Sequence, residues 1–225
     1  MAEPAPAVQP TVQQDRSEVA DRVAELRQQA AADPLQARDE TWRWFGQLGE
    51  QAGRDAEPAA AALAELFALG DPPAGIEGRT EGILVAPTIS APVDRLLRGI
   101  SGAWMPWLGK RFDSGADRGD NVLQKFARWP AKLLWPAYTT RELGDDRTAF
   151  DFETRVEPSE DDSDVDVLVI DYVVVDANPR FLIKRIRDEL VEIVPGANLG
   201  KVLWRHGDGS YALIGFFALR NEPGA

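Results

Sequence analysis

The fold is decided between residues 78 and 112, which contain Gly78-Arg79-Thr80-Glu81-Gly82-Ile83-Leu84-Val85-Ala86-Pro87-Thr88, then Asp94-Arg95-Leu96-Leu97, then Trp107-Leu108-Gly109-Lys110-Arg111-Phe112. Glycines bracket a short apolar strand, a Pro-Thr pair interrupts it, and a second strand carries the Trp-x-Gly-Lys-Arg-Phe sequence. This arrangement predicts the opening of a small antiparallel β-barrel, whose interior holds either side chains or one small ligand. The pattern therefore indicates a binding function without naming the ligand.

Further strands are expected as far as residue 221, so the predicted barrel domain spans residues 76–221. Between Arg147 and Val156 apolar or neutral residues alternate with polar ones, a period of two that is typical of a half-buried strand. Residues 165–175 predict a more apolar strand. Gly207-Asp208-Gly209, between the strands 201–205 and 210–219, predicts a closing hairpin. Other strands are expected around 103–112, 120–128 and 131–143.

One helix is expected inside the barrel domain, just before the closing hairpin. Asn178-Pro179 is a typical helix start, and Pro195-Gly196 is a typical helix end. Between them four apolar residues recur at intervals of three and four, namely Ile183, Ile186, Leu190 and Ile193. Such a helix would cap one end of the barrel.

Residues before the barrel predict a disordered tail, 1–14, and a helical region, 15–70. The tail is rich in Ala, Pro, Val and Gln, whereas the helical region shows apolar stripes, an Asp33-Pro34 start and a Gly70 stop. Three aromatic residues lie close together in the second helix, Trp42, Trp44 and Phe45. They must be buried either against the barrel or against a partner, which includes a homodimer. The predicted fold class is thus α+β, with N-terminal helices followed by an antiparallel β-barrel.

Composition excludes several functional classes. The 225 residues carry a net charge of −12, which disfavours binding to nucleic acid or to an anionic membrane surface. The absence of cysteine removes disulfides, thiolate metal sites and cysteine nucleophiles. No apolar run approaches the ~18 residues of a membrane span. A cytoplasmic location is expected, with no metal and no cofactor.

With these strands placed, residues 78–112 resemble the opening of the GXWXG-type lipocalin-like proteins, a bacterial family of unknown function with a calycin- or nitrobindin-like barrel. The glycine-bracketed strand, the Pro87-Thr88 break, Asp94 with Leu96 and Leu97, and residues 107–112 carry the resemblance. Thr80 stands where the family has a tryptophan between the two glycines, so the chain is similar as a divergent relative. The resemblance implies a calycin-like barrel and, by analogy, small-ligand binding.

Aromatic and cationic side chains of the predicted barrel supply the candidate binding site. Trp and Tyr offer large contact areas with a polar edge, which suits a pocket for a hydrophobic or amphipathic ligand; alternatively, the rings simply fill the barrel. The candidate ligand-binding residues are Trp107, Lys110, Arg111, Phe112, Trp135, Phe150, Phe152, Tyr172, Trp204 and Phe217. Of the neighbours Lys110 and Arg111, one should face inward, where it would pair with a ligand carboxylate or with an acid of the protein.

The leading interpretation is non-enzymatic binding of a small hydrophobic or amphipathic ligand. A structural or protein-interaction module that uses the helices is the second. An enzyme that uses Lys110, Arg111, Asp171 or Tyr172 as acid, base or anion clamp is the third, although no catalytic motif supports it. A haem barrel is a further alternative, but the single histidine, His206, should lie at the hairpin tip and face solvent, where it cannot ligate iron inside the barrel.

Overall fold

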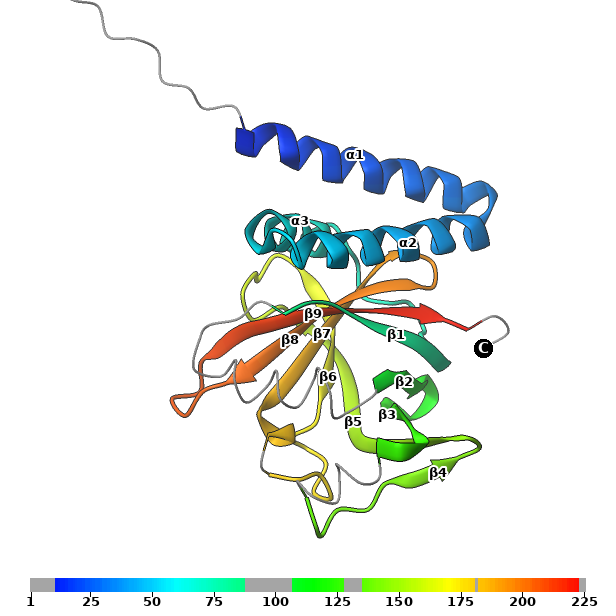
Figure 1. Cartoon of the computed structure of the whole chain (residues 1–225), viewed down its shortest axis with the longest axis vertical. Helices are drawn as coiled ribbons and strands as arrows, with labels where there is room; N and C mark the ends of the chain where they lie inside the picture. Colours follow the sequence, from blue (N-terminus) through cyan, green and yellow to red (C-terminus); the bar gives the residue numbers. More distant parts are fainter. Residues whose placement is uncertain (1–10, 88–106, 128–134, 181, 223–225) are drawn as a thin grey trace, which may run out of the picture.

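The computed structural model describes residues 11–87, 107–127, 135–180 and 182–222 (Figure 1). Three helices lie together on one side of a β-barrel: α1 (Thr11–Ala32), α2 (Pro34–Ala52) and α3 (Ala56–Ala68). The barrel strands are β1 (Gly78–Pro87), β2 (Trp107–Asp113), β3 (Arg118–Gln124), β5 (Asp146–Pro158), β6 (Asp166–Asp171), β7 (Ile186–Val194), β8 (Ala197–Arg205) and β9 (Tyr211–Asn221). A short strand, β4 (Arg141–Leu143), pairs with the start of β5.

The strands form a closed antiparallel ring. Neighbours follow the order β3-β2-β1-β9-β8-β7-β6-β5, and the pairing of β3 with β5 closes the barrel of eight strands in the described part of the chain. Closure leaves those strands without a free edge. The predicted α+β fold class, helices followed by an antiparallel barrel, is confirmed.

The helices cover the outer face of the barrel wall. One apolar cluster joins them to β1 and β6–β9; its fully buried members include Phe45, Leu63, Leu66, Phe67, Val191 and Ile193. Trp42 and Trp44 are partly buried against the same cluster. Each fully buried side chain of this size contributes about 1.5–3 kcal/mol to the stability of the packed state. The aromatic residues of α2 therefore pack inside the chain, and the helices support the barrel wall.

A second apolar cluster fills the barrel interior. Its members come from every barrel strand except β1 and from the segments between strands, and include Phe112, Leu123, Phe150, Phe152, Ile170, Tyr172, Leu190, Trp204, Phe217 and Leu219. Strands β6–β9 contribute side chains to both clusters, because one face of each strand lies in the barrel interior and the other lies in the outer cluster. Such strands are apolar on both faces.

The predicted helix over 178–195 is wrong: residues 186–194 form β7, preceded by only a short 3₁₀ turn, Ile183–Arg185. Ile186 and Leu190 face the interior cluster, whereas Ile193 faces the helices. Because both faces of the strand are buried, the apolar residues match helical spacing by coincidence. Pro195-Gly196 is a tight turn joining β7 to β8, with Gly196 at φ +78°.

Other boundaries shift less. Helix α1 begins at Thr11, inside the range 1–14 assigned to a disordered tail. The strand expected over 131–143 is limited, in its described part, to β4, because residues 135–140 form turns. Asp94, Leu96 and Leu97 lie in 88–106, outside the described residues. Among the described helices, none combines the length and hydropathy needed to cross a membrane.

Candidate functional site

The two halves of the 78–112 pattern pair with each other and orient Lys110. Strands β1 and β2 are antiparallel neighbours, with Gly78 opposite Phe112. Gly109 sits at a β-bulge with φ +144°, and a Cβ there would lie 2.1 Å from the Thr80 carbonyl oxygen. Thr80 Oγ1 donates to the Lys110 carbonyl at 2.9 Å and accepts its N–H at 3.2 Å. The bulge and this hydroxyl fix the backbone that aims Lys110 into the barrel.

Inside the barrel, Lys110 forms a polar cluster with side chains from three other segments. Its Nζ donates to Asn121 Oδ1 at 3.0 Å, to Asp188 Oδ2 at 2.9 Å and to the hydroxyl of Tyr172. Tyr172 in turn donates to Asp188 Oδ2 at 2.9 Å. Lys110 is 2% exposed and Asp188 is 4% exposed, so the ion pair is buried. All three hydrogens of the ammonium have acceptors within the protein.

Aromatic rings enclose this cluster. The ring centroids of Trp107, Phe152, Tyr172 and Phe217 lie 5.7, 5.3, 5.2 and 5.3 Å from Lys110 Nζ. Trp107 Nε1 also donates to Asn121 Oδ1 at 3.0 Å, and Asn121 Nδ2 donates to the Phe150 carbonyl at 3.0 Å. The ring faces add cation–π attraction to the ion pair.

Burial changes the protonation equilibria of the cluster. Loss of solvation lowers the pKa of Lys110, and the attraction of Asp188 opposes that shift. Loss of solvation also raises the pKa of Tyr172 well above its ordinary value, and the negative charge of Asp188 raises it further. Tyr172 therefore keeps its proton and acts as a hydrogen-bond donor. Lys110 and Asp188 are placed to exchange a proton directly.

One acceptor of the cluster is free. Asp188 Oδ1 is buried and accepts no hydrogen bond from the residues that the structure describes, whereas Oδ2 accepts from both Lys110 and Tyr172. A buried carboxylate oxygen without a donor costs about 1–3 kcal/mol relative to a satisfied one. An N–H or O–H group placed beside that oxygen would remove this cost.

Arg111 faces away from Lys110, which confirms that one of the two cations points inward and the other outward. Its guanidinium pairs with Asp120 on the outer wall, Nη2 to Oδ2 at 2.6 Å. Arg111, Phe112 and Phe152 help to line a pocket of about 580 Å³ beside β2, β3 and β5. Phe152 thus belongs both to this pocket and to the aromatic enclosure of Lys110.

The other predicted residues lie elsewhere in the interior cluster. Trp135 packs edge-on against Phe150 with centroids 5.1 Å apart, and Trp204 lies under the guanidinium of Arg185 at 5.7 Å. None of these contacts involves Lys110. His206 is exposed at the turn between β8 and β9, as predicted, and therefore lies outside the barrel interior.

Sequence reasoning missed Asn121 and Asp188. Asp188 was assigned to a helix, so its place on an inward strand position was hidden. Read as a strand, residues 186, 188 and 190 share one face, which places this carboxylate between two interior apolar residues. Because the residues between them are also buried, the sequence carried no separate signal for that face. Asn121 lies opposite Lys110 because β2 pairs with β3. This contact could be predicted only from the register of the two strands.

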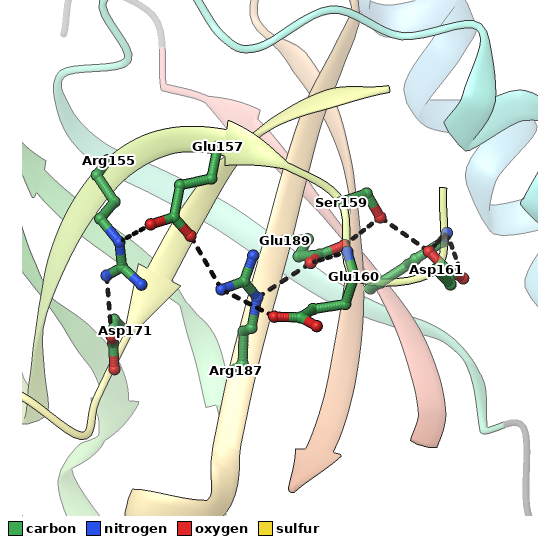
Figure 2. Close-up of polar contacts among 9 residues, drawn as sticks. Arg155, Glu157, Ser159, Glu160, Asp161, Asp171, Arg187 and Glu189 are labelled. Carbon is green, nitrogen blue, oxygen red and sulfur yellow. Dashed lines mark hydrogen bonds and ion pairs between the residues drawn. The ribbon is translucent and has the colours of Figure 1, made fainter. Parts of the chain in front are cut away.

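A second polar network lies on the outer face of β7. Figure 2 shows Arg187 donating to Glu189 Oε1 at 3.0 Å and Ser159 Oγ donating to Glu189 Oε2 at 2.6 Å. Lys201, on β8, donates to Asp161 Oδ1 at 2.8 Å. These contacts tie the loop between β5 and β6 to the wall. Every acid and base drawn in Figure 2 has a partner, so this network is read as structural.

In comparisons with known proteins, no family model, no curated protein and no solved structure matches the chain. Within the described ranges, no group of three or more His, Cys, Asp or Glu side chains is arranged to hold a metal ion. The site must therefore be interpreted from its own geometry.

Proposed function

We propose that the protein is a non-enzymatic binder of a small amphipathic ligand in the barrel, with the polar end of the ligand at the cluster of Lys110, Asn121, Tyr172 and Asp188. The observation that carries the proposal is the buried ion pair with one unpaired carboxylate oxygen. A barrel interior needed only for stability is better filled by apolar side chains, because burying charges costs several kcal/mol per ion before pairing. Buried, perturbed titratable groups gather at functional sites.

The contacts narrow the chemistry of the ligand. Lys110 already donates three hydrogen bonds, so a ligand carboxylate would have to displace a protein acceptor. Asp188 Oδ1, by contrast, needs a donor. A hydroxyl or N–H group at the polar end of the ligand, either present in the free ligand or formed when it binds, would satisfy that oxygen, and the apolar part of the ligand would pack on rings such as Trp107 and Phe217. The resemblance to GXWXG-type lipocalin-like barrels supports the same class of function.

Native mass spectrometry of freshly purified protein, followed by organic extraction, tests the proposal. The intact protein should carry a bound small molecule. Asp188→Asn should reduce the fraction of protein that carries it, because a carboxylate has two acceptor oxygens and an amide has only one. Asp171→Asn is the matched control, since Asp171 pairs with Arg155 on the outer wall. A protein without bound mass, together with a crystal structure whose interior has no room for a ligand, would refute the proposal.

The helices do not favour the interaction-module interpretation. Their large apolar side chains pack against the barrel, which leaves no comparable apolar face of α2 or α3 for a partner among the described residues.

A further inference from the structure

We propose that Lys110 is a reactive amine, and that the barrel holds an aldehyde or ketone as an imine on its Nζ. The inference deepens the proposed function and rests on it, because the carbonyl compound must first occupy the barrel interior. It names a ligand class, and it gives the buried lysine and the open oxygen of Asp188 a chemical role in addition to binding.

The first requirement is a neutral amine. Asp188 Oδ2 lies 2.9 Å from Nζ, so it can take a proton from the ammonium directly. Loss of solvation favours the neutral form of the amine and lowers the pKa of Lys110. A lysine desolvated among apolar groups is the usual form of a nucleophilic lysine.

The second requirement is a balanced route to the imine. The amine nitrogen attacks the carbonyl carbon, a C–N bond forms, the carbonyl π bond breaks, and proton transfer gives a carbinolamine. The carbinolamine hydroxyl can donate to Asp188 Oδ1, which has no other donor. The C–O bond then breaks and water leaves. The overall change is R₂C=O plus Lys-NH₃⁺ giving R₂C=NH⁺-Lys plus H₂O, with no oxidant or reductant.

The third requirement is protection of the product. A protonated imine hydrolyses when water reaches it, and here four aromatic rings surround Nζ at 5.2–5.7 Å. Asp188 remains as the counter-ion of the iminium. Tyr172, whose pKa is raised by burial and then by Asp188, keeps its proton and stabilises that carboxylate with a hydrogen bond at 2.9 Å.

Another buried lysine provides an internal comparison. Lys201 is 5% exposed and lies 4.2 Å from the Phe67 ring centroid, but it is on the outer wall, where both oxygens of Asp161 accept from it. Lys125 is exposed. Burial alone would make Lys110 and Lys201 alike, whereas the proposal distinguishes them.

The experiment incubates the full-length protein with hexanal and sodium cyanoborohydride at neutral pH, and locates the reduced hexyl adducts by peptide mass spectrometry. Lys110 should be modified about tenfold faster than Lys201 or Lys125, because it lies inside the barrel among aromatic rings with Asp188 beside it, whereas Lys201 is on the outer wall and Lys125 is exposed. Asp188→Asn should slow modification of Lys110 by about a hundredfold. Asp161→Asn is the matched control, and should leave modification of Lys110 unchanged.

The outcomes separate the two proposals. Modification of Lys125 with Lys110 left intact in the wild-type protein overturns the imine, and this readout needs no variant to fold. If Lys110 is not modified but native mass spectrometry still shows a bound molecule that depends on Asp188, the binding function is retained and the imine is rejected. If no bound molecule is found and Lys110 is inert, both fall.

Discussion

At the scale of single residues, the decisive feature is a buried ion pair, whose two charges are costly to remove from water. Lys110 and Asp188 are joined at 2.9 Å and are less than one-tenth exposed. A buried pair of this kind adds little net stability compared with apolar side chains, yet removing one partner leaves an unpaired charge. The pair therefore contributes less to net stability than its short distance suggests.

A double-mutant cycle tests that interpretation. Lys110→Met should lower the free energy of unfolding by about 3–5 kcal/mol, because Asp188 is left as an uncompensated buried charge. Lys110→Met combined with Asp188→Leu should recover most of this loss, measured by urea denaturation. Losses that simply add in the double variant would show that the two side chains are not coupled, which would contradict this account of the buried pair.

The glycine that precedes Lys110 should be as sensitive as the lysine. Gly109→Ala places a Cβ 2.1 Å from the Thr80 carbonyl oxygen at φ +144°, a conformation that L side chains rarely adopt. We expect a loss of at least about 2 kcal/mol in the free energy of unfolding. Gly207→Ala is the matched control, since nothing lies within 4 Å of its added Cβ. Equal stability of the two variants would contradict this account of the bulge.

At the scale of elements, the loop between β5 and β6 is held to the wall by ionised groups (Figure 2). Burial alone would raise the pKa of Asp161, but hydrogen bonds from Lys201 and Ser159 outweigh it, and the pKa lies below its ordinary 3.8. The pKa of Glu157 lies below 4.5, chiefly because Arg155 donates to it. A carboxyl group whose pKa falls on folding stabilises the folded state above its unfolded pKa.

Acid should therefore release this loop. Its contribution to stability is complete above about pH 4.5 and is lost as the pH falls below 3.8 through the lowered folded pKa values. Hydrogen exchange over residues 159–165 should accelerate in that window relative to β8. In Asp161→Asn the loop should exchange faster at neutral pH and respond less to acid; a wild-type pH response retained in full would argue against the Lys201–Asp161 contact.

At the scale of the whole molecule, the helices are part of the core. Their side chains complete an apolar cluster on the outer faces of β1 and β6–β9 (Figure 1), which includes the fully buried Val167, Val169 and Leu199. A barrel without that cover would expose a contiguous apolar wall, which is typical of aggregating proteins.

Deleting residues 1–70 should therefore yield insoluble protein or soluble oligomers, measured by fractionation and size-exclusion chromatography. Deleting residues 1–10 is the control, because it leaves α1–α3 intact, and it should leave the elution volume of the folded protein consistent with an unchanged oligomeric state. A soluble barrel with native near-ultraviolet circular dichroism after the larger deletion would show that the helices serve a partner instead.

The sequence by itself determined the helices, most strands and the closing hairpin, because local periodicity and turn residues report which face of an element is buried. It also identified Lys110, Trp107 and Tyr172 as candidates. The helix assigned to 178–195 failed because β7 is covered by the interior on one face and by the helices on the other, so its apolar spacing carried no period of two. Only the tertiary structure, through strand register, decided that Asp188 and Asn121 meet Lys110. Contacts between residues 78 positions apart depend on how the barrel closes, which local sequence does not encode.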